Sequence, residues 1–183
     1  MPMTTTHALV PIAVALAVSQ RPVPWRLVAV AAFAAALPDV DWVAHHFFRV
    51  PDSSIYSHRG ATHSLFAALA AGVVAACLHK RLNIGALTAG VVVAASMASH
   101  GLLDMMTDTG RGVAYLWPLS SARLFADWRP LHGGSVHMAH LLPQTIARLR
   151  SELWQLILPM FAIALVVRVG RSFLGRAPQR PRS

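Results

Sequence analysis

Five apolar stretches constrain what this chain can fold into. They are rich in Ala, Leu and Val and do not alternate apolar with polar residues, which favours helices over strands. The stretches run from Ala8 to Val18, Trp25 to Leu37, Leu65 to Leu78, Ile84 to Ser99 and Leu153 to Val169. Several are shorter than the roughly 20 residues that a perpendicular membrane-spanning helix needs. We therefore predict an all-α integral membrane bundle of about four to five apolar helices, the first two of which form a partly screened hairpin or extend through their flanks.

The composition places this bundle in a membrane. Of the 183 residues, 55% are apolar and only 13% are charged, and the mean hydropathy is +0.51. Ordinary soluble domains are less apolar. No repeat of fixed period and no long Gly/Ser linker divides the chain. We predict one membrane-embedded domain over residues 1–170 and a basic, disordered tail over residues 171–183, with the single cysteine, Cys77, as a small buried hydrophobic residue.

The net charge of +9 points to anionic lipid headgroups rather than to nucleic acid. The basic residues form no aromatic-interleaved stripe and no known nucleic-acid-reading motif. If each stretch crosses once, the short connectors 19–24 and 79–83 and the segment 170–183 share one face. That face carries Arg21, Arg26, Lys80, Arg81, Arg168, Arg171, Arg176, Arg180 and Arg182. The positive-inside bias puts it in the cytoplasm. An N-terminal signal peptide is the alternative for the first stretch, but no Lys or Arg precedes it.

Histidines and aspartates gather at the ends of the apolar stretches. The motifs are Leu37-Pro38-Asp39-Val40-Asp41, His58-Arg59-Gly60-Ala61-Thr62-His63-Ser64 and Ser99-His100-Gly101-Leu102-Leu103-Asp104, with His7 near the start of the first stretch. Ionisable groups near hydrocarbon persist mainly when they are paired, bind metal or face a water-filled cavity. His100 and Asp104 are four residues apart and share one face of a helix. Imidazole and carboxylate donors without thiolate suit one or two divalent ions, Zn first and Mn or Fe as alternatives.

Each motif has a second interpretation that needs no metal. His100 and Asp104 can hydrogen-bond to each other, and the D-x-D pair can end a helix. Arg59 can bind an anion or stabilise a transition state, but it can equally form a salt bridge to an aspartate. Asp41 is a candidate for orienting a ligating histidine or for acting as a general base.

Local polar residues and the remaining histidines receive structural roles. Thr4, Thr5 and Thr6 are candidate caps for the first helix, and Thr62 is a candidate cap for a helix that begins near His63. We interpret the remaining histidines of the polar connectors as interfacial or loop residues, namely His45, His46, His132, His137 and His140. An aromatic belt at headgroup depth is expected from Trp42, Phe47, Phe48, Trp117 and Trp128.

Taken in order, these motifs resemble those of the YdjM-like membrane-bound metal-dependent hydrolases. This family consists of inner-membrane proteins, and some of its members are linked to the LexA regulon. The resemblance spans about residues 7 to 118 and includes Thr107, Gly110 and Leu116-Trp117-Pro118. It implies a multi-pass protein of the bacterial inner membrane with a hydrolase-like metal site. Together with the motifs, the resemblance implies two sets of site residues. The candidate metal ligands are His7, Asp39, His58, His63, His100 and Asp104. The candidate catalytic residues are Asp41 and Arg59.

We therefore expect a membrane-bound metal-dependent hydrolase that acts on a phosphoester or lipid-like, anionic substrate on the periplasm-like side. The alternative is a non-catalytic metal-binding or metal-transporting membrane protein. Transport is disfavoured because Val28 to Ala36, Leu69 to Ala76 and Val91 to Ala95 contain no ionisable residue. A third alternative is a structural membrane protein in which the His and Asp residues merely pair.

Overall fold

The computed structural model describes residues 3–19, 22–131 and 141–174. Helices and loops make up this part of the chain, which contains no strand and only two isolated β-bridges. Helices form over each of the five apolar stretches, so the all-α prediction is confirmed for these residues. The elements are α1 (Thr4–Val18), α2 (Trp25–Ala36), η1 (Leu37–Asp39), α3 (Val40–Phe48), η2 (Ala61–His63), α4 (Leu65–Cys77), α5 (His79–Leu82), α6 (Ala86–Met105), α7 (Leu141–Glu152), η4 (Leu153–Ile157) and α8 (Leu158–Leu174).

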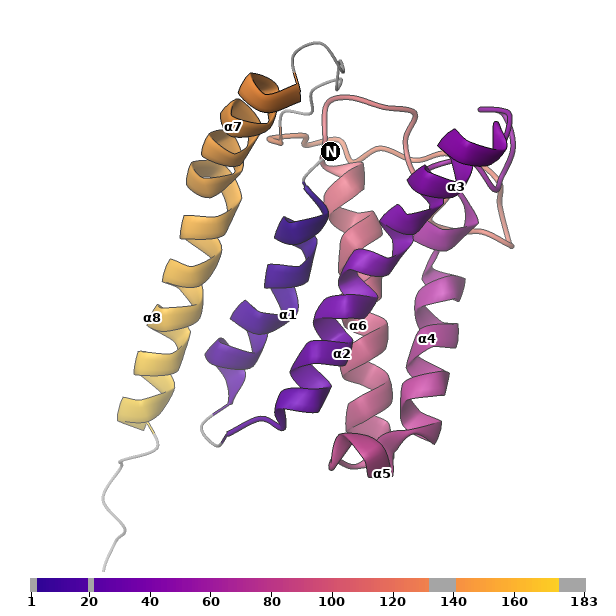
Figure 1. Cartoon of the computed structure of the whole chain (residues 1–183). Coiled ribbons are helices and arrows are strands. Elements are labelled where there is room, and N and C mark those ends of the chain that lie inside the picture. Colours follow the sequence, from indigo (N-terminus) through magenta and orange to yellow (C-terminus); the bar gives the residue numbers. More distant parts are fainter. Residues whose placement is uncertain (1–2, 20–21, 132–140, 175–183) are drawn as a thin grey trace, which may run out of the picture.

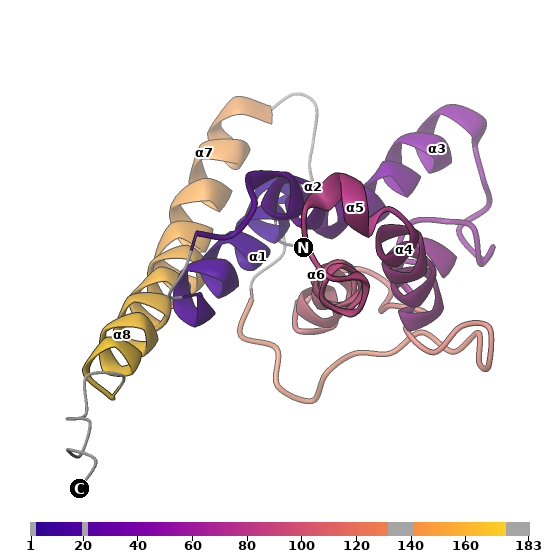
Figure 2. The same ribbon diagram turned by 90° about the horizontal axis from the view of Figure 1, so that it is seen from below.

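The helices pack side by side in an order that differs from their order in the chain. Helix α4 packs against α6, α6 against α2, α2 against α1, and α1 against α8. The long helix formed by α7, η4 and α8 lies at one edge of the bundle, whereas α3 projects from the opposite side (Figures 1 and 2). Helices α1 and α2 run antiparallel to each other, and so do α4 and α6 (Figure 1). As a result, His7, Asp39, His63 and His100 all come to the same end of the bundle.

Small residues allow the central helices to approach closely. The buried core contains Ala34, Ala68, Ala75 and Ala89 beside Leu27, Leu82, Val93 and Met97. At the crossing of α4 and α6, a Cβ atom built on Gly72 would lie 2.7 Å from the carbonyl oxygen of Gly90. Small residues are common where membrane helices meet, because packing rather than the hydrophobic effect holds them together there.

Two helices in the described residues are long and apolar enough to cross a membrane. They are α6 and the continuous helix Pro143–Phe173, while α1 and α4 are apolar but shorter. Large apolar side chains face outwards, for example Val73 on α4, Val91 on α6 and Val166 on α8. The predicted number of four to five membrane helices therefore stays a prediction.

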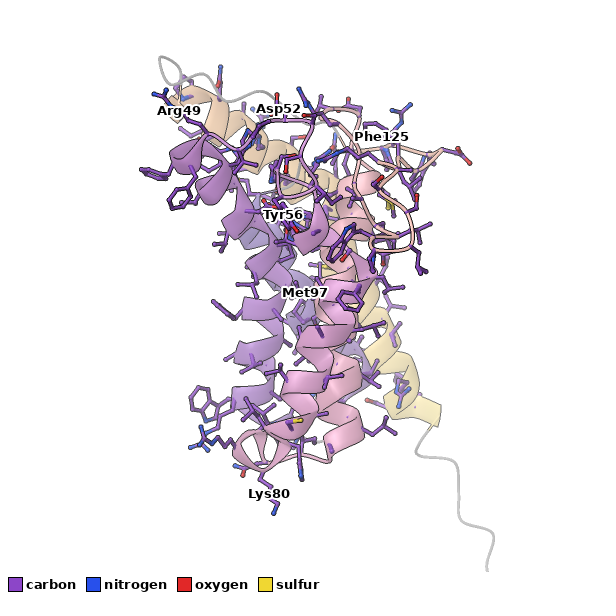
Figure 3. All side chains as sticks on the ribbon, turned by 90° about the vertical axis from the view of Figure 1, so that its right-hand side faces the viewer. Arg49, Asp52, Tyr56, Lys80, Met97 and Phe125 are labelled. Atoms are coloured by element: carbon purple, nitrogen blue, oxygen red, sulfur yellow. The ribbon has the colours of Figure 1, made fainter. Side chains whose placement is uncertain are left out.

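The bundle has two chemically different ends. Lys80 lies at one end, while Asp52, Tyr56 and Phe125 lie at the other, where loops cover the helix ends (Figure 3). Arg26 donates a hydrogen bond to the carbonyl oxygen of Arg81 over 3.2 Å, so these basic residues gather at the Lys80 end.

The structure also bears on the predictions for Cys77 and for the C-terminal tail. Cys77 is exposed, so the prediction that it is buried was wrong: it is the last residue of α4 and lies on the outside of the bundle. Helix α8 continues to Leu174, and residues 175–183 of the expected tail lie outside the described residues.

Candidate metal centre

Five buried side chains from four separate segments meet at the loop-covered end of the bundle. His7 comes from the first turn of α1, Asp39 from η1, His63 from η2, and His100 and Asp104 from the last turns of α6. His7, His100 and Asp104 are 0% exposed, and His63 and Asp39 are only slightly accessible. Ionisable groups this deeply buried need partners, because desolvation of an unpaired charge is costly.

Local structure explains how the sequence delivers these groups. Pro38 sits in the first turn of η1, a short 3₁₀ segment that links α2 to α3 without breaking the helical path. This geometry buries both Asp39 and Asp41, and Asp39 faces His100 whereas Asp41 contacts Nδ1 of His63. His100 and Asp104 lie on one face of α6, as their spacing predicted, with Nε2 and Oδ2 4.0 Å apart.

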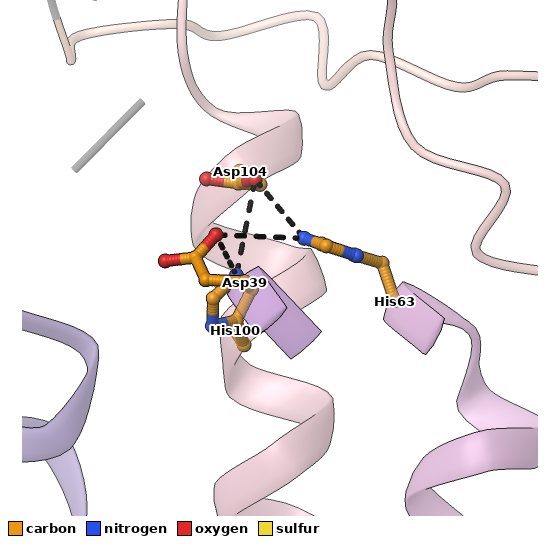
Figure 4. Close-up of side chains that lie close together, drawn as sticks. All are labelled: Asp39, His63, His100 and Asp104. Carbon is orange, nitrogen blue, oxygen red and sulfur yellow. Dashed lines mark ion pairs between the residues drawn. The ribbon is translucent and has the colours of Figure 1, made fainter. Parts of the chain in front are cut away.

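The donor atoms surround one small space (Figure 4). His100 Nε2 lies 3.4 Å from Asp39 Oδ1, and His63 Nε2 lies 3.6 Å from Asp104 Oδ2 and 3.9 Å from Asp39 Oδ1. His7 Nε2 lies 3.6 Å from Asp104 Oδ1, and its ring stacks on that of His100 with the centroids 3.7 Å apart. Donors bound to one tetrahedral ion at about 2.1 Å lie about 3.4 Å from each other. The observed spacings are at or slightly above that value.

Unpaired polar atoms mark the same space. Within the described residues, the Nε2 atoms of His7, His63 and His100 and the Oδ1 atoms of Asp39 and Asp104 are buried and have no hydrogen-bond partner. Buried polar atoms are nearly always hydrogen-bonded, so five such atoms facing one another require an explanation. Asp39, His63, His100 and Asp104 offer donor atoms within 4.8 Å of one another, so one cation could be shared by these four residues, and His7 lies directly beside them. The donor set fits a divalent metal ion.

The outward nitrogens of two histidines are held by protein acceptors. His100 Nδ1 lies 2.7 Å from the carbonyl oxygen of Ala35. A carbonyl oxygen accepts only, so Nδ1 carries the proton and Nε2 keeps its lone pair. His63 Nδ1 lies 3.1 Å from Asp41 Oδ2. Contacts of this kind fix the tautomer and the ring orientation of metal-binding histidines.

Asp41 lies behind the donor atoms and connects several side chains that surround the centre. Its carboxylate accepts hydrogen bonds from His58 Nδ1 at 2.7 Å, from His63 Nδ1 and from the hydroxyl of Thr62. Burial raises the pKa of Asp41, but these three hydrogen bonds outweigh burial and hold the pKa well below its usual range. Burial lowers the pKa of His63, which keeps its imidazole neutral and able to bind metal.

The structure separates His58 from the main cluster. Its Nδ1 faces Asp41, and the ring is partly exposed. Asp41, His58 and His63 form a second group whose donor atoms are close enough to share an ion. His58 thus does not join the other five predicted ligands, because Asp41 lies between them.

Arg59 is buried against the cluster. Its Nε lies 3.1 Å from Asp104 Oδ2, and its two terminal nitrogens donate to the Thr107 hydroxyl and to the carbonyl oxygen of Thr109. Gly110 has φ +94°, and a Cβ atom there would lie 2.5 Å from the guanidinium. The structure therefore contains the salt bridge to an aspartate that the sequence left open.

Two helix caps differ from those expected. No threonine caps α1: Thr4 lies in its first turn and donates to Asp39 Oδ2, while Glu152 accepts from the backbone N–H of Met3. Ser64 rather than Thr62 caps α4. The sequence offered one signal for Glu152, because it is the only acidic residue after Asp127 and directly precedes an apolar stretch.

A cleft of about 860 Å³ opens beside the centre. Asp39, His58 and Arg59 lie on its wall, together with Trp42 and Val43 of α3 and the cationic Arg111 and Arg148. Arg111 also pairs with Asp52. His45 lines the same cleft, whereas His132, His137 and His140 lie outside the described residues.

The sequence is similar to those of known proteins. The family model described as "YdjM inner membrane protein" matches residues 1–174, which extends well beyond Pro118, where the recognised motifs end. The inner membrane protein YbcI of Escherichia coli strain K12 is 36% identical over 130 residues, which cover 70% of this chain and 75% of YbcI. No solved structure matches the chain. The chain belongs to the YdjM inner membrane protein family.

Proposed function

We propose that this chain is a membrane-bound metal-dependent hydrolase. The observation that carries the proposal is the convergence of five buried, unpaired nitrogen and oxygen atoms from four segments of the chain. Zinc is the first candidate, with manganese or iron as alternatives, because the donors are imidazoles and carboxylates. When bound, such an ion supplies a water molecule with a pKa of about 7 and polarises a phosphoryl oxygen.

Each residue of the centre has a role in this proposal. The ligands are His7, Asp39, His63, His100 and Asp104. Asp41 orients His63, since both of its carboxylate oxygens are engaged by hydrogen bonds. His58 lines the cleft and is paired with Asp41, an arrangement suited to moving a proton to or from a substrate. A second ion at Asp41, His58 and His63 would replace the hydrogen bonds that Asp41 accepts, so it is the alternative to these two roles.

The cleft supports a phosphoester or lipid-like substrate. One wall is formed by Trp42 and Val43, which suit an apolar moiety, and Arg111 and Arg148 supply positive charge for an anionic group. Arg59 contributes positive charge deeper in the cleft, beside Asp104. Membrane lipids are the partners that combine these two properties.

We also propose the bacterial inner membrane as the location, with several membrane passes and the centre on the periplasm-like side. Membership of an inner membrane protein family supports the location. The basic residues near Arg26 and Lys80 lie at the end of the bundle away from the centre, which supports the orientation.

Elemental analysis tests the metal centre. Detergent-purified wild type is expected to hold one or two equivalents of metal, and the His100→Ala/Asp104→Ala variant is expected to hold none. A matched control is His79→Ala/Asp127→Asn, which removes one imidazole and one carboxylate away from the centre and should retain the metal. The absence of metal from wild type, even after incubation with Zn, Mn and Fe, would contradict the proposal.

Hydrolysis is then measured with a chromogenic phosphodiester and with phospholipid vesicles, before and after chelation. Turnover that is lost on chelation and restored by added metal supports the proposed hydrolase activity. Stoichiometric metal without turnover of either substrate class favours the non-catalytic metal-binding alternative.

A further inference from the structure

A carboxylate from the C-terminal helix reaches the first turn of α1. Glu152 Oε1 and Oε2 accept hydrogen bonds from the backbone N–H of Met3 at 2.9 Å and 3.0 Å. The hydroxyl of Thr6 also donates to Oε2. Glu152 is only 6% exposed, although it is 149 residues away from Met3 in the chain. This contact joins two distant parts of the chain at the end of the bundle that holds the centre.

Helix α1 lacks the usual means of satisfying its own N-terminus. Its first N–H groups have no partner within the helix, and it has no side-chain cap and no acidic residue in its first turn. Glu152 supplies an acceptor as well as the negative charge that a helix N-terminus favours. The carboxylate therefore fixes where α1 begins.

The turn held by Glu152 carries two groups of the metal centre. His7 faces Asp104 over 3.6 Å and stacks on His100, and Thr4 donates to Asp39. His7 makes no hydrogen bond through either ring nitrogen in the described residues. Unlike His63 and His100, it has no acceptor for Nδ1 among the described residues, so, apart from the stack on His100, its position depends on the backbone of this turn.

The helix that provides Glu152 is irregular at this point. The π-helical segment Leu153–Ile157 follows directly, and Pro159 behind it cannot donate a hydrogen bond to the carbonyl of Gln155. Such widened turns occur frequently at functional sites. Here the irregular turn adjoins the residue that contacts α1.

We infer that Glu152 is a positioning residue of the metal centre, which holds the first turn of α1 so that His7 faces Asp104 and His100. The role at the metal rests on the function proposed above. The contact between Glu152 and α1 does not depend on metal, so it can be tested separately.

The first experiment measures amide hydrogen exchange in the metal-free protein. Glu152→Gln removes the charge and one acceptor while keeping the shape of the side chain. Amides in the first turn of α1 are expected to exchange faster in this variant than in wild type. Asp127→Asn, which neutralises an exposed carboxylate elsewhere, should leave them unchanged. Equal protection of this turn in Glu152→Gln and wild type would overturn the inference, whether or not the protein binds metal.

The second experiment is a double-mutant cycle on Zn²⁺ affinity. Glu152→Gln should weaken binding about tenfold in wild type, the lower end for contacts that support a ligand. It should change affinity less than about twofold in a His7→Ala background, because its effect passes through His7. An equal loss in both backgrounds would show a general structural effect and contradict the inference. If Glu152→Gln does not fold, Thr6→Val replaces it in both experiments, with a smaller expected effect in the same direction.

Wild type without affinity for Zn, Mn or Fe would defeat the proposed function, and the exchange experiment alone would then decide whether Glu152 positions α1.

Discussion

Asp41 acts through the imidazoles that it contacts. Its Oδ2 contacts His63 and Thr62, and its Oδ1 accepts a hydrogen bond from His58, which lies on the wall of the cleft. The carboxylate therefore links a candidate ligand to a candidate proton carrier. Its contribution should be measurable separately in metal affinity and in turnover.

Replacement of Asp41 by Asn should lower metal affinity about 10- to 100-fold, because an amide cannot accept hydrogen bonds through both of its heavy atoms. The measurement is competition with a metal chelator in detergent. Asp127→Asn is the control for loss of one carboxylate. Unchanged affinity in Asp41→Asn would show that His63 needs no orienting partner.

The stability of the metal-free protein should fall as pH falls. His63 has a pKa below its unfolded value of about 6.5, and Asp41 has a pKa below its unfolded value of about 3.8. For both groups the unfolded state binds protons more readily, so their stabilisation is present above the unfolded pKa and is lost below it. The loss begins at His63, below about pH 6.5, and continues at Asp41 under stronger acid.

Thermal unfolding in detergent at pH 7.5, 6.0 and 4.5 measures this loss. His63→Gln should unfold with a weaker dependence on pH between the first two values. A wild-type unfolding temperature that rises on acidification would contradict the assignment.

At the scale of helices, the contact between α4 and α6 depends on glycine. A methyl group on Gly72 would lie 2.7 Å from both the Gly90 carbonyl oxygen and the Cβ atom of Ala94. We expect Gly72→Ala to lower the free energy of unfolding by about 1–3 kcal/mol, the usual cost of overpacking. Gly170→Ala is the matched control, because a Cβ atom there meets nothing within 4 Å. Equal unfolding temperatures for the two variants would show that α4 and α6 adjust without cost.

The helices were predictable from sequence because their signal is local. Long runs of Ala, Leu and Val located the helices over the five apolar stretches, and four-residue spacing placed His100 beside Asp104. Helices α3 and α7 were not predicted, because they lie in connectors without such runs. The contacts of Arg59 were not predictable, because its choice of Asp104, Thr107 and Thr109 depends on a turn at Gly110 far along the chain. Glu152 was missed for the same reason, since its partner is a backbone N–H that no sequence motif identifies.

At the scale of the whole molecule, the difference between the two ends of the bundle predicts its orientation. A reporter enzyme that is active only outside the cytoplasm should be inactive when it is fused after Ser183. The same reporter should be active when it is inserted at Ser53, in the loop beside the centre. Activity of both fusions, or the reverse pattern, would contradict the proposed topology.

The five donors of the centre come from segments spread between His7 and Asp104, and two of them are carboxylates that repel each other when no cation separates them. A bound ion would therefore act as a staple across more than half of the chain, and its binding energy would add to folding stability. On this basis, metal supply would govern the lifetime of the protein: molecules made during metal starvation would open more often and be degraded sooner, so abundance would report on metal supply.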